Sequence, residues 1–421
     1  MATRYWLGKQ APVSQVDTVT VGGTLSDETF VISIDGVQIV SILDTDNDVD
    51  TVRTNLVTAW NLSTVAYATG ITAAEGGTGE LTLTADVGGL PFTIDLNTPG
   101  GSATFSKAAT TAADGPNFWD TAENWSGDTI PGTGDTVVLR NSAIPICWNI
   151  DQNALAIDRL VIESSFTGRV GINRNVLAIS ADAISVDNSA ADYREDYLRI
   201  DVDTVEIGGT TGPGRSNGST RIKIDNTKTS GASTTTIFST AATSIETGLP
   251  AVRLLYANSD AELRVRSTSG GVGVACDEPA ETSTIGTIAL SGNSSIYIGE
   301  GTTLTTFEQE GGTASLRSAG TIATVRIYGG SVTTEGDYTI TLLEIFDGSV
   351  IANHIKTGGV AVTTLDLEGG VIDCSANLDD RTFTNVNLKR GGSLVAHAEH
   401  LTITNLNNPT DGKYSLLAQD A

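Results

Sequence analysis

The last third of the chain repeats one phrase, and this repeat constrains the fold more than any other feature of the sequence. Each copy has a short alternating strand, a glycine turn and a second short strand, as in TVRIYGGSV, LLEIFDGSV, TLDLEGGVI and NVNLKRGGSL. A period of about 20 residues with this content is typical of a β-solenoid, in which each coil stacks on the next. We therefore expect a mainly β chain whose body is a right-handed parallel β-helix. The turn glycines, which recur close to this period, are Gly312, Gly330, Gly348, Gly370 and Gly392.

Alternation within the repeats predicts which side chains face the core. Two apolar residues flank one polar residue before each turn, and a further apolar residue follows two positions after it. Because successive side chains of a strand point to opposite faces, the apolar ones should be inward and the polar ones outward. The predicted inward residues are Val325, Ile327, Leu343, Ile345, Leu365, Leu367, Val386, Leu388, Ala314, Val332, Val350, Ile372 and Leu394. The predicted outward residues are Arg326, Glu344, Asp366 and Asn387.

The remainder of the body has the same alternation of short apolar strands and glycine turns, with less regular spacing. We interpret 291–408 as regular coils, 158–290 as irregular coils with looped-out segments such as TTGPGRSNGSTR, and 409–421 as a C-terminal tail. With 46 glycines, 18% charged residues and 5% aromatic residues, the composition favours strands and tight turns over helices.

Residues 13–110 predict a separate, small α+β domain. TFVISIDGVQIVSI alternates around Asp35-Gly36, which is a strong signal for a β-hairpin. Apolar residues then recur at helical spacing from Val49 to Trp60, after acidic residues that suit a helix N-terminus. GITAA, GELTLTADV and LPFTIDL indicate further strands. One amphipathic helix covering one face of a small sheet is the expected packing.

The acidic run DTDNDVD offers two interpretations. Its D-x-D-x-D spacing, from Asp44 to Asp48, matches the start of a calcium-binding loop. However, the glycine of such a loop is missing, and its twelfth position is Asn55 instead of glutamate. We favour a solvated turn that leads to a helix N-cap.

Cysteine and histidine do not form a recognisable metal site. Cys147, Cys276 and Cys374 are far apart in the sequence and indicate buried thiols instead of a disulfide framework or zinc site. His397 and His400 lie in a strand-like segment, where a spacing of three should send them to opposite faces. We therefore expect neither a metal nor another cofactor.

Polysaccharide-cleaving β-helices need two convergent carboxylates, one protonated and one ionised. Acidic residues are scattered over nearly every coil, so chance pairs are expected and none stands out. G-x-S-x-G and P-loop patterns are also missing from the sequence. We therefore expect no enzymatic activity, with a polysaccharide depolymerase as the alternative. Its candidate carboxylates are Asp379 with Asp380, Glu308 with Glu310, and Asp373 with Asp366.

The charge restricts the partners of this chain. A formal net charge of −26 opposes binding to nucleic acid, which requires clustered Lys and Arg, and to an anionic membrane surface. The sequence has no apolar run of about 18 residues, and its start, MATRYWLGKQ, lacks the apolar region of a signal peptide. We expect synthesis in a cytoplasm and a highly soluble surface.

Tryptophans gather in GPNFWDTAENWSGDTIPGTGDTVVL, residues 115–139. Trp119 and Trp125, with Trp148 nearby, are candidates for an aromatic sugar-binding platform. Alternatively, they plug the open end of the solenoid, because a first coil must hide its core and its unpaired strand edge. Tryptophan suits this second role because it is large and its N–H can still be paired. We favour the cap.

The start ATRYWLG and the tryptophan-rich stretch together resemble the opening of a group of bacteriophage structural proteins. In that group a Tyr-Trp-x-Gly start is followed by W…N-W-S, a proline, G-D-x-V and the first strand of a β-rich body. The resemblance implies a split cap, with residues 1–12 as its first half, 111–157 as its second half and first strands, and the small domain inserted between them. The matching residues are Tyr5, Trp6, Gly8, Trp119, Asn124, Trp125, Ser126, Pro131, Gly134, Asp135 and Val137.

This resemblance implies a virion structural protein without catalytic activity. Within that class we favour a capsid decoration, cement or head-fibre protein on the particle exterior, with the major capsid protein or another virion protein as partner. By analogy with viral β-helices we expect a homotrimer. Tyr328 and Phe346 are candidates for its protomer interface, or else isolated surface aromatics. The alternatives are a tail fibre or tailspike that binds host surface glycan, and a bacterial surface adhesin.

Overall fold

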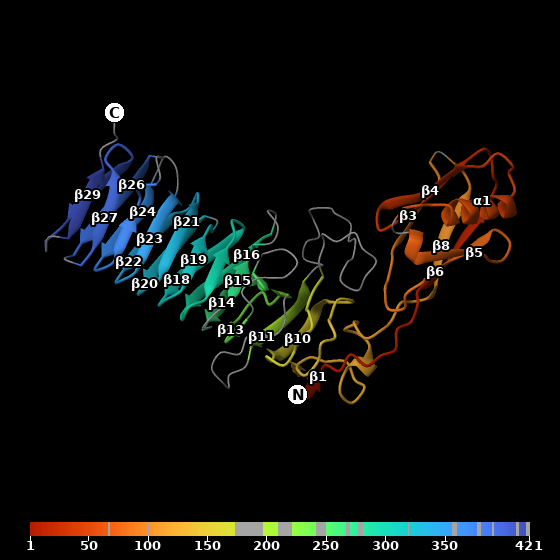
Figure 1. Cartoon of the computed structure of the whole chain (residues 1–421), viewed down its shortest axis with the longest axis horizontal. Helices are drawn as coiled ribbons and strands as arrows, with labels where there is room; N and C mark the ends of the chain where they lie inside the picture. Colours follow the sequence, from red (N-terminus) through yellow and green to blue (C-terminus); the bar gives the residue numbers. More distant parts are fainter. Residues whose placement is uncertain are drawn as a thin grey trace.

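A computed structural model describes most of the chain as one parallel β-solenoid with a small domain beside its first coil (Figure 1). The fold class predicted from the sequence is confirmed: the chain is mainly β, with a parallel solenoid body and a small N-terminal domain. The described residues are 1–65, 68–99, 101–172, 197–208, 221–240, 250–266, 270–276, 281–318, 320–355, 360–376, 380–389, 391–409 and 412–417.

Parallel strands build the solenoid. From β16 onward, an even-numbered strand precedes each turn and an odd-numbered strand follows it, and each strand pairs with the strand two positions later. The predicted inward residues of the regular coils are all at most 5% exposed, which confirms the predicted phase of the repeat. The strands are β1 (Thr3–Tyr5), β9 (Thr136–Leu139), β10 (Asp151–Ile162), β11 (Leu198–Ile207), β12 (Ile222–Asn226), β13 (Ser233–Ile237), β14 (Val252–Val265), β15 (Gly271–Val274), β16 (Ser283–Leu290), β17 (Ser295–Ile298), β18 (Thr302–Gln309), β19 (Thr313–Leu316), β20 (Thr321–Ile327), β21 (Ser331–Gly336), β22 (Thr339–Ile345), β23 (Ser349–Ile355), β24 (Val360–Leu367), β25 (Val371–Asp373), β26 (Arg381–Leu388), β27 (Ser393–His397), β28 (Leu401–Asn407) and β29 (Lys413–Leu417).

The even-numbered strands are longer than the sequence repeat predicts, and they turn a corner. In β20 the buried residues are Ile322, Val325 and Ile327. The two successive residues between Ile322 and Val325 therefore both lie outside the core. A flat strand would alternate strictly, so this slip marks a bend. Each such strand therefore contributes to two faces of its coil, and the following odd-numbered strand contributes to a third.

Glycine is required at the turns for two reasons. Gly312, Gly330, Gly348 and Gly370 have φ values between +71° and +85°, the left-handed region that glycine tolerates best. A Cβ atom on Gly348 would also lie 2.6 Å from the carbonyl oxygen of Gly330 in the preceding coil. Gly392 departs from this pattern, because its φ is not positive. Its Cα is instead crowded by Leu367, since an added Cβ would lie 2.6 Å from Leu367 Cγ.

Coil length varies greatly along the solenoid, although the strand pairing is continuous. Leu160 pairs with Val205 across a long coil, whereas Phe307 pairs with Val325 across a coil less than half as long. Much of the extra length falls on residues 173–196 and 209–220, so the looped-out segments predicted there, TTGPGRSNGSTR among them, lie almost wholly outside the described residues. The buried side chains nevertheless form one core from the first coil to β28.

The small domain differs from its predicted packing because it contains two antiparallel sheets instead of one. One sheet has the order β5-β6-β2-β8 and the other β4-β3-β7. Helix α1 contributes Val52, Leu56 and Trp60 to the core of this domain. The predicted hairpin at Asp35-Gly36 is present, with φ values of +49° and +77° at these two residues. The elements are β2 (Val16–Gly22), β3 (Thr29–Ile34), β4 (Val37–Leu43), α1 (Val49–Asn61), β5 (Ile71–Glu75), β6 (Glu80–Ala85), β7 (Ile94–Asn97) and β8 (Thr104–Thr111), with 3-10 helices η1 (Ala68–Gly70) and, in the cap, η2 (Ala122–Asn124).

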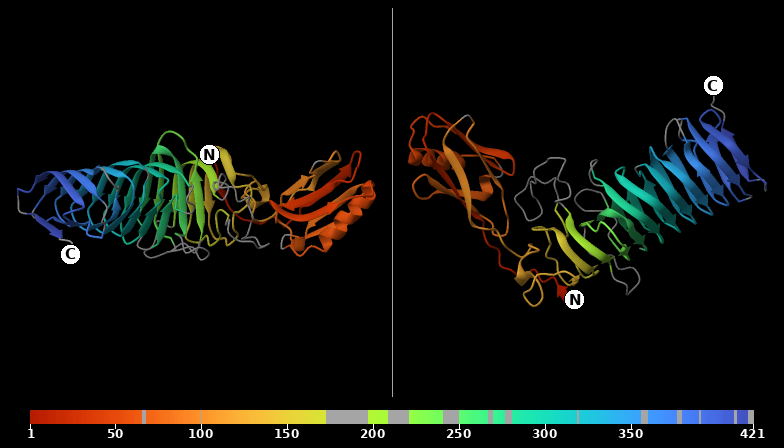
Figure 2. Two further views of the ribbon diagram at one scale, coloured as in Figure 1. Left: turned by 90° about the horizontal axis from the view of Figure 1, so that it is seen from above. Right: turned by 180° about the vertical axis from the view of Figure 1, so that it is seen from behind.

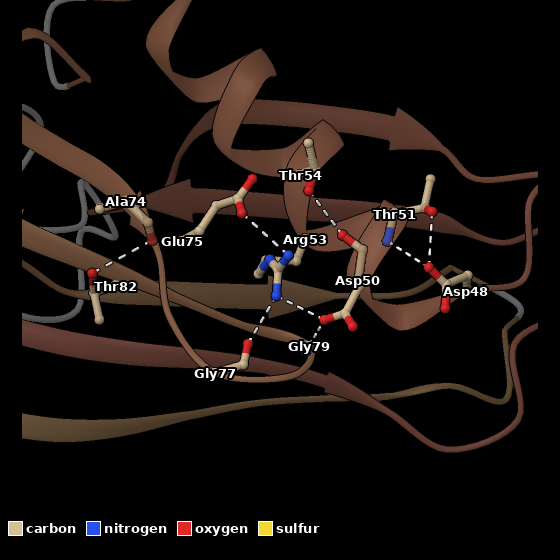
Figure 3. Close-up of polar contacts among 10 residues, drawn as sticks. All are labelled: Asp48, Asp50, Thr51, Arg53, Thr54, Ala74, Glu75, Gly77, Gly79 and Thr82. Carbon is tan, nitrogen blue, oxygen red and sulfur yellow. Dashed lines mark hydrogen bonds and ion pairs between the residues drawn. The ribbon is translucent and has the colours of Figure 1, made fainter.

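Charged groups fix the start of α1 on the β5–β6 hairpin (Figure 3). Asp48 is the N-cap and accepts a 2.9 Å hydrogen bond from Thr51 N, as predicted for the end of the acidic run. Asp50 accepts from Gly79 N at 2.9 Å and pairs with Arg53 at 2.7 Å. Arg53 also pairs with Glu75 at 3.1 Å. The acidic run is thus used for capping and ion pairing within the domain, and no group of residues suited to holding a metal occurs among the described residues.

Two chain segments, joined by an isolated antiparallel bridge between Val13 and Asp114, connect the small domain to the first coil. Val13 N donates to Asp114 O at 2.7 Å, and Asp114 N donates back to Val13 O at 3.4 Å. Gly89 N also donates to Val13 O, at 2.9 Å, which holds the domain against the linker. The views in Figure 2 show the small domain beyond the first coil and the C-terminus at the opposite end of the solenoid.

Candidate functional site

Tryptophans from both halves of the predicted cap meet at the first coil. The ring centroids of Trp6 and Trp125 are 5.0 Å apart, and those of Trp119 and Trp125 are 4.8 Å apart, both edge-on. All three side chains are at most 1% exposed. Trp125 Nε1 donates to Trp119 O at 2.7 Å, and Trp6 Nε1 donates to Ile144 O at 3.1 Å. Buried rings of this kind cannot serve as a sugar platform, which corrects that alternative for these residues.

Polar groups connect the two halves of the cap. Asn124 is fully buried, and its side chain donates to Gly115 O and Phe118 O while accepting from Gln10 N. Asp135 accepts from Ala2 N at 2.7 Å, and burial of this carboxyl would by itself raise its pKa. The hydrogen bonds that it receives outweigh burial, so its pKa lies below the ordinary value.

The other predicted cap residues border the first strands. Pro131 is buried directly before the turn that leads to β9. Tyr5 ends β1, which pairs in parallel with β9, so the first coil begins with the N-terminal residues. The Tyr5 ring is half-buried, and Arg140 Cζ lies 4.0 Å from its centroid.

One longitudinal sheet carries ion-paired and amide side chains on successive coils, and we call its outer surface the ladder face. It is formed by β11, β13 and the second halves of β14, β16, β18, β20, β22, β24, β26 and β28. Two rows of outward residues run along it, offset by two positions in each strand. The first row is Glu206, Thr236, Arg264, Ala289, Glu308, Arg326, Glu344, Asp366, Asn387 and Asn407. The second row is Phe238, Arg266, Ser291, Glu310, Tyr328, Phe346, Glu368 and Lys389.

Neighbouring coils of the ladder face are connected through ion pairs and amides. Arg326 pairs with Glu308 at 3.0 Å and with Glu344 at 2.7 Å, and hydrogen bonds to Glu344 and then Glu308 raise its pKa. Asn387 donates to Asp366 at 2.5 Å. These half-exposed contacts favour the observed register and contribute little to stability individually.

Tyr328 and Phe346 form the exposed aromatic pair of the ladder face. Their rings are stacked, with centroids 4.8 Å apart and planes inclined by 6°. The side chains are 46% and 37% exposed, so they are not isolated surface aromatics but a two-ring stack open to solvent. The centroid separation equals the spacing of neighbouring strands, so the stack runs along the solenoid axis.

A hollow of about 360 Å³ lies next to this stack. Its floor is made by small residues, Ala289 of the first row and Ser291 of the second. The preceding coil borders it with Glu262, Arg264 and Arg266, and the following coils with Glu308, Glu310 and Tyr328. From the sequence, Glu308 and Glu310 could be paired as carboxylates, but nothing connected them with either arginine or with Tyr328. The R-x-R pattern of Arg264 and Arg266 and the E-x-E pattern of Glu308 and Glu310, two coils apart, are the sequence features that could have indicated the hollow.

A second hollow, of about 590 Å³, lies near the cap. Tyr5, Arg140, Arg159 and Glu206 contribute to its lining. Three of its charged side chains are engaged, because Arg159 pairs with Glu206 at 2.6 Å and Arg140 covers the Tyr5 ring. Glu163 also lines it and accepts a 3.4 Å hydrogen bond from Ser165 Oγ.

Neither of the other two carboxylate pairs suggested by the sequence is seen among the described residues. Asp366 and Asp373 lie on different strands, β24 and β25, and their register partners differ, so this pair is not formed across one face. Asp380 Oδ1 lies 3.0 Å from His400 Nδ1, so Asp380 contacts a histidine. Asp379 lies outside the described residues.

The prediction that His397 and His400 point to opposite faces of a strand was wrong. His400 belongs to the turn between β27 and β28, not to a strand, so the alternation rule does not apply. The rings of His397 and His400 therefore approach each other, with centroids 6.4 Å apart. Cys147 and Cys374 are buried and Cys276 is half-buried, none of the three forms a disulfide in the structure, and burial raises the pKa of Cys374 to about 12.

Buried polar groups occur in the irregular coils, where the sequence pattern did not indicate them. Tyr197 Oη donates to Glu281 at 2.6 Å, and Lys223 Nζ lies 5.0 Å from the Tyr197 ring centroid. Arg253 Nε donates to Pro250 O at 3.1 Å. Each of the four charged or phenolic side chains is at most 3% exposed, so these groups are part of the buried interior and do not form an open site.

Comparison of the chain with protein-family models, curated proteins and solved structures found no match. Among the described residues, no helix has the length and apolar character needed to cross a bilayer. We therefore infer the function from the solenoid, its cap and the ladder face.

Proposed function

We propose that this chain is a non-enzymatic structural protein of a bacteriophage particle, displayed on its exterior as a capsid decoration, cement or head-fibre protein and assembled as a homotrimer. The observation that carries this proposal is the split cap. The chain starts the first coil, leaves it to build the small domain, and returns to close the same coil with buried tryptophans. This construction presents a separate domain at one end of a rod.

The rod itself suits a structural role. Its apolar core is continuous from the cap to β28, and parallel ladders connect every coil with the next. Such an array is stabilised by contacts between neighbouring coils along its whole length. The net charge of −26 would keep densely displayed rods soluble and resistant to nonspecific adhesion.

Copy number and position on purified particles test the proposal. The protein should be found on particles by quantitative mass spectrometry, and labelled antibodies should locate it on the exterior. Copies comparable in number with the major capsid protein favour decoration. A few copies at the tail favour the alternative of a fibre or tailspike, and absence from particles together with presence on bacterial cells would favour an adhesin and contradict the proposal.

A further inference from the structure

We propose that the hollow beside Tyr328 is a binding subsite for a neutral saccharide. This inference concerns the ladder face alone and does not depend on where the protein is displayed. The hollow is lined by an exposed aromatic ring, charged groups of both signs and two small residues, a combination that the structural role of the rod does not require.

The geometry of the aromatic stack places the second face of the Tyr328 ring on the side of the hollow, next to Glu310, its neighbour in the second row. Phe346 covers one face of Tyr328, and the stack follows the solenoid axis. The opposite face of Tyr328 is therefore directed toward the coil of Glu310 and, beyond it, the coil of Ser291, which is the floor of the hollow. A flat ligand stacked on this face would extend the two-ring stack into the hollow.

Unpaired charges define the polar part of the subsite. Arg264 is engaged by Glu262 through two 2.6 Å hydrogen bonds, and Glu308 is engaged by Arg326. Arg266 and Glu310, in contrast, form no ion pair with any described residue. A guanidinium and a carboxylate that have no ion pair within the described part of the chain therefore border the hollow on its two sides.

This lining matches a polyhydroxylated ring. Each sugar hydroxyl can donate to a carboxylate and accept from a guanidinium, and such charge-assisted hydrogen bonds are strong. The C–H groups of a pyranose face suit the negative face of an aromatic ring. An anionic ligand would meet three carboxylates, and a purely apolar ligand would leave the charged groups desolvated and unpaired.

The same surroundings make a protomer interface at the aromatic pair less suitable. The cores of protein interfaces are depleted in charged residues. Tyr328 and Phe346 are bordered along their row by Glu310 on one side and by Glu368, which pairs with Lys389, on the other. A solvated saccharide tolerates these charges better than a second protein surface does.

An array of defined bacterial surface oligosaccharides, neutral and uronic acid-containing, tests the proposal with the full-length protein. The wild type should bind at least one neutral oligosaccharide, and titration calorimetry with that oligosaccharide should give affinities about tenfold weaker for Tyr328→Ala and for Glu310→Gln, the scale of one lost stacking or hydrogen-bonding contact. Tyr297→Ala is the matched control, because Tyr297 is a comparably exposed tyrosine, 48%, on the face formed by β17. Its affinity should equal that of the wild type.

Three results would overturn the proposal. The wild type binds no neutral oligosaccharide on the array, binding is as tight in Tyr328→Ala as in the wild type, or Tyr328→Ala converts a wild-type oligomer into a monomer. The last outcome would assign the aromatic pair to a second copy of the chain. None of the three changes the copy number on particles, so the proposed structural function is tested separately.

Discussion

Trp6 packs edge-on against Trp125, although the whole small domain separates them in the sequence. Their contact joins the strand that opens the first coil to the segment that closes it. The cap consequently depends on both halves of the chain, and its stability can be tested by removing either ring.

Trp6→Ala and Trp125→Ala should each lower the free energy of unfolding of the solenoid by about 3–5 kcal/mol, the usual cost of removing a large buried ring. The double variant should lose less than the sum, because the two rings share one contact. Urea unfolding followed by circular dichroism measures these values. Trp60→Ala, an equal truncation in the core of the small domain, is the control and should leave the solenoid transition unchanged.

Removal of the small domain should leave the solenoid folded. The ends of the insertion meet at the 2.7 Å hydrogen bond from Val13 N to Asp114 O, so a short turn can replace residues 14–113. The chain has five tryptophans, and this deletion removes Trp60 alone, so the remaining fluorescence reports on the cap region. We expect its cooperative unfolding transition to persist. Loss of that transition would show that the cap requires the inserted domain.

Gly348→Ala should destabilise the solenoid more than Gly320→Ala does. Both glycines have positive φ, +85° and +71°, so alanine costs about 1–2 kcal/mol at either position. At Gly348 the new Cβ would also lie 2.6 Å from Gly330 O, whereas at Gly320 it meets nothing within 4 Å. Thermal unfolding of the two variants isolates the contribution of the close contact between coils. Equal destabilisation would mean that the turn can shift to admit a methyl group.

Asp35→Asn should change how the stability of the small domain depends on pH. Burial raises the pKa of Asp35 to about 6, despite its hydrogen bond from Thr93 N. A carboxyl whose pKa is higher in the folded state destabilises that state as pH rises from the unfolded value of about 3.8 toward 6. The variant should therefore match the wild type below about pH 4 and exceed its stability by up to about 3 kcal/mol above pH 6. Hydrogen exchange of peptides from 29–43 at increasing urea concentration measures the difference, and a difference that does not vary with pH would contradict the assignment.

The regular coils could be predicted from the sequence because two signals coincide there. Alternation predicts the inward residues on both sides of Arg326, Glu344, Asp366 and Asn387. The glycine turns indicate where each coil begins again. The corner in β20 was not anticipated, since two successive outward residues in a strand resemble a simple break in the pattern. Strands β2 and β8 of the small domain were missed for related reasons. Buried Asp17 interrupts the apolar alternation of β2, and β8 is largely exposed.

The hollow could not be located from the sequence, because it depends on the register between coils of different length. Arg264 pairs with Ala289, and Ala289 pairs with Glu308, but the first of these coils is longer than the second. No single period aligns these residues, so only the pairing of the strands reveals that they share one row. The cap tryptophans, in contrast, were recognisable from their local motif, and their burial decides between the two roles that the motif allowed.

The linker between the small domain and the first coil consists of two chain segments, and this has a mechanical consequence. Pulling on the small domain divides the load between two chain segments, both anchored in the first coil through β1 and β9. A protease that cuts the segment between the domain and β9 leaves the domain covalently joined to β1, which its parallel pairing with β9 holds in the first coil. A cut on the other side leaves the domain covalently joined to β9. A single cut therefore does not release the domain, whereas it would release a domain joined by a single terminal linker.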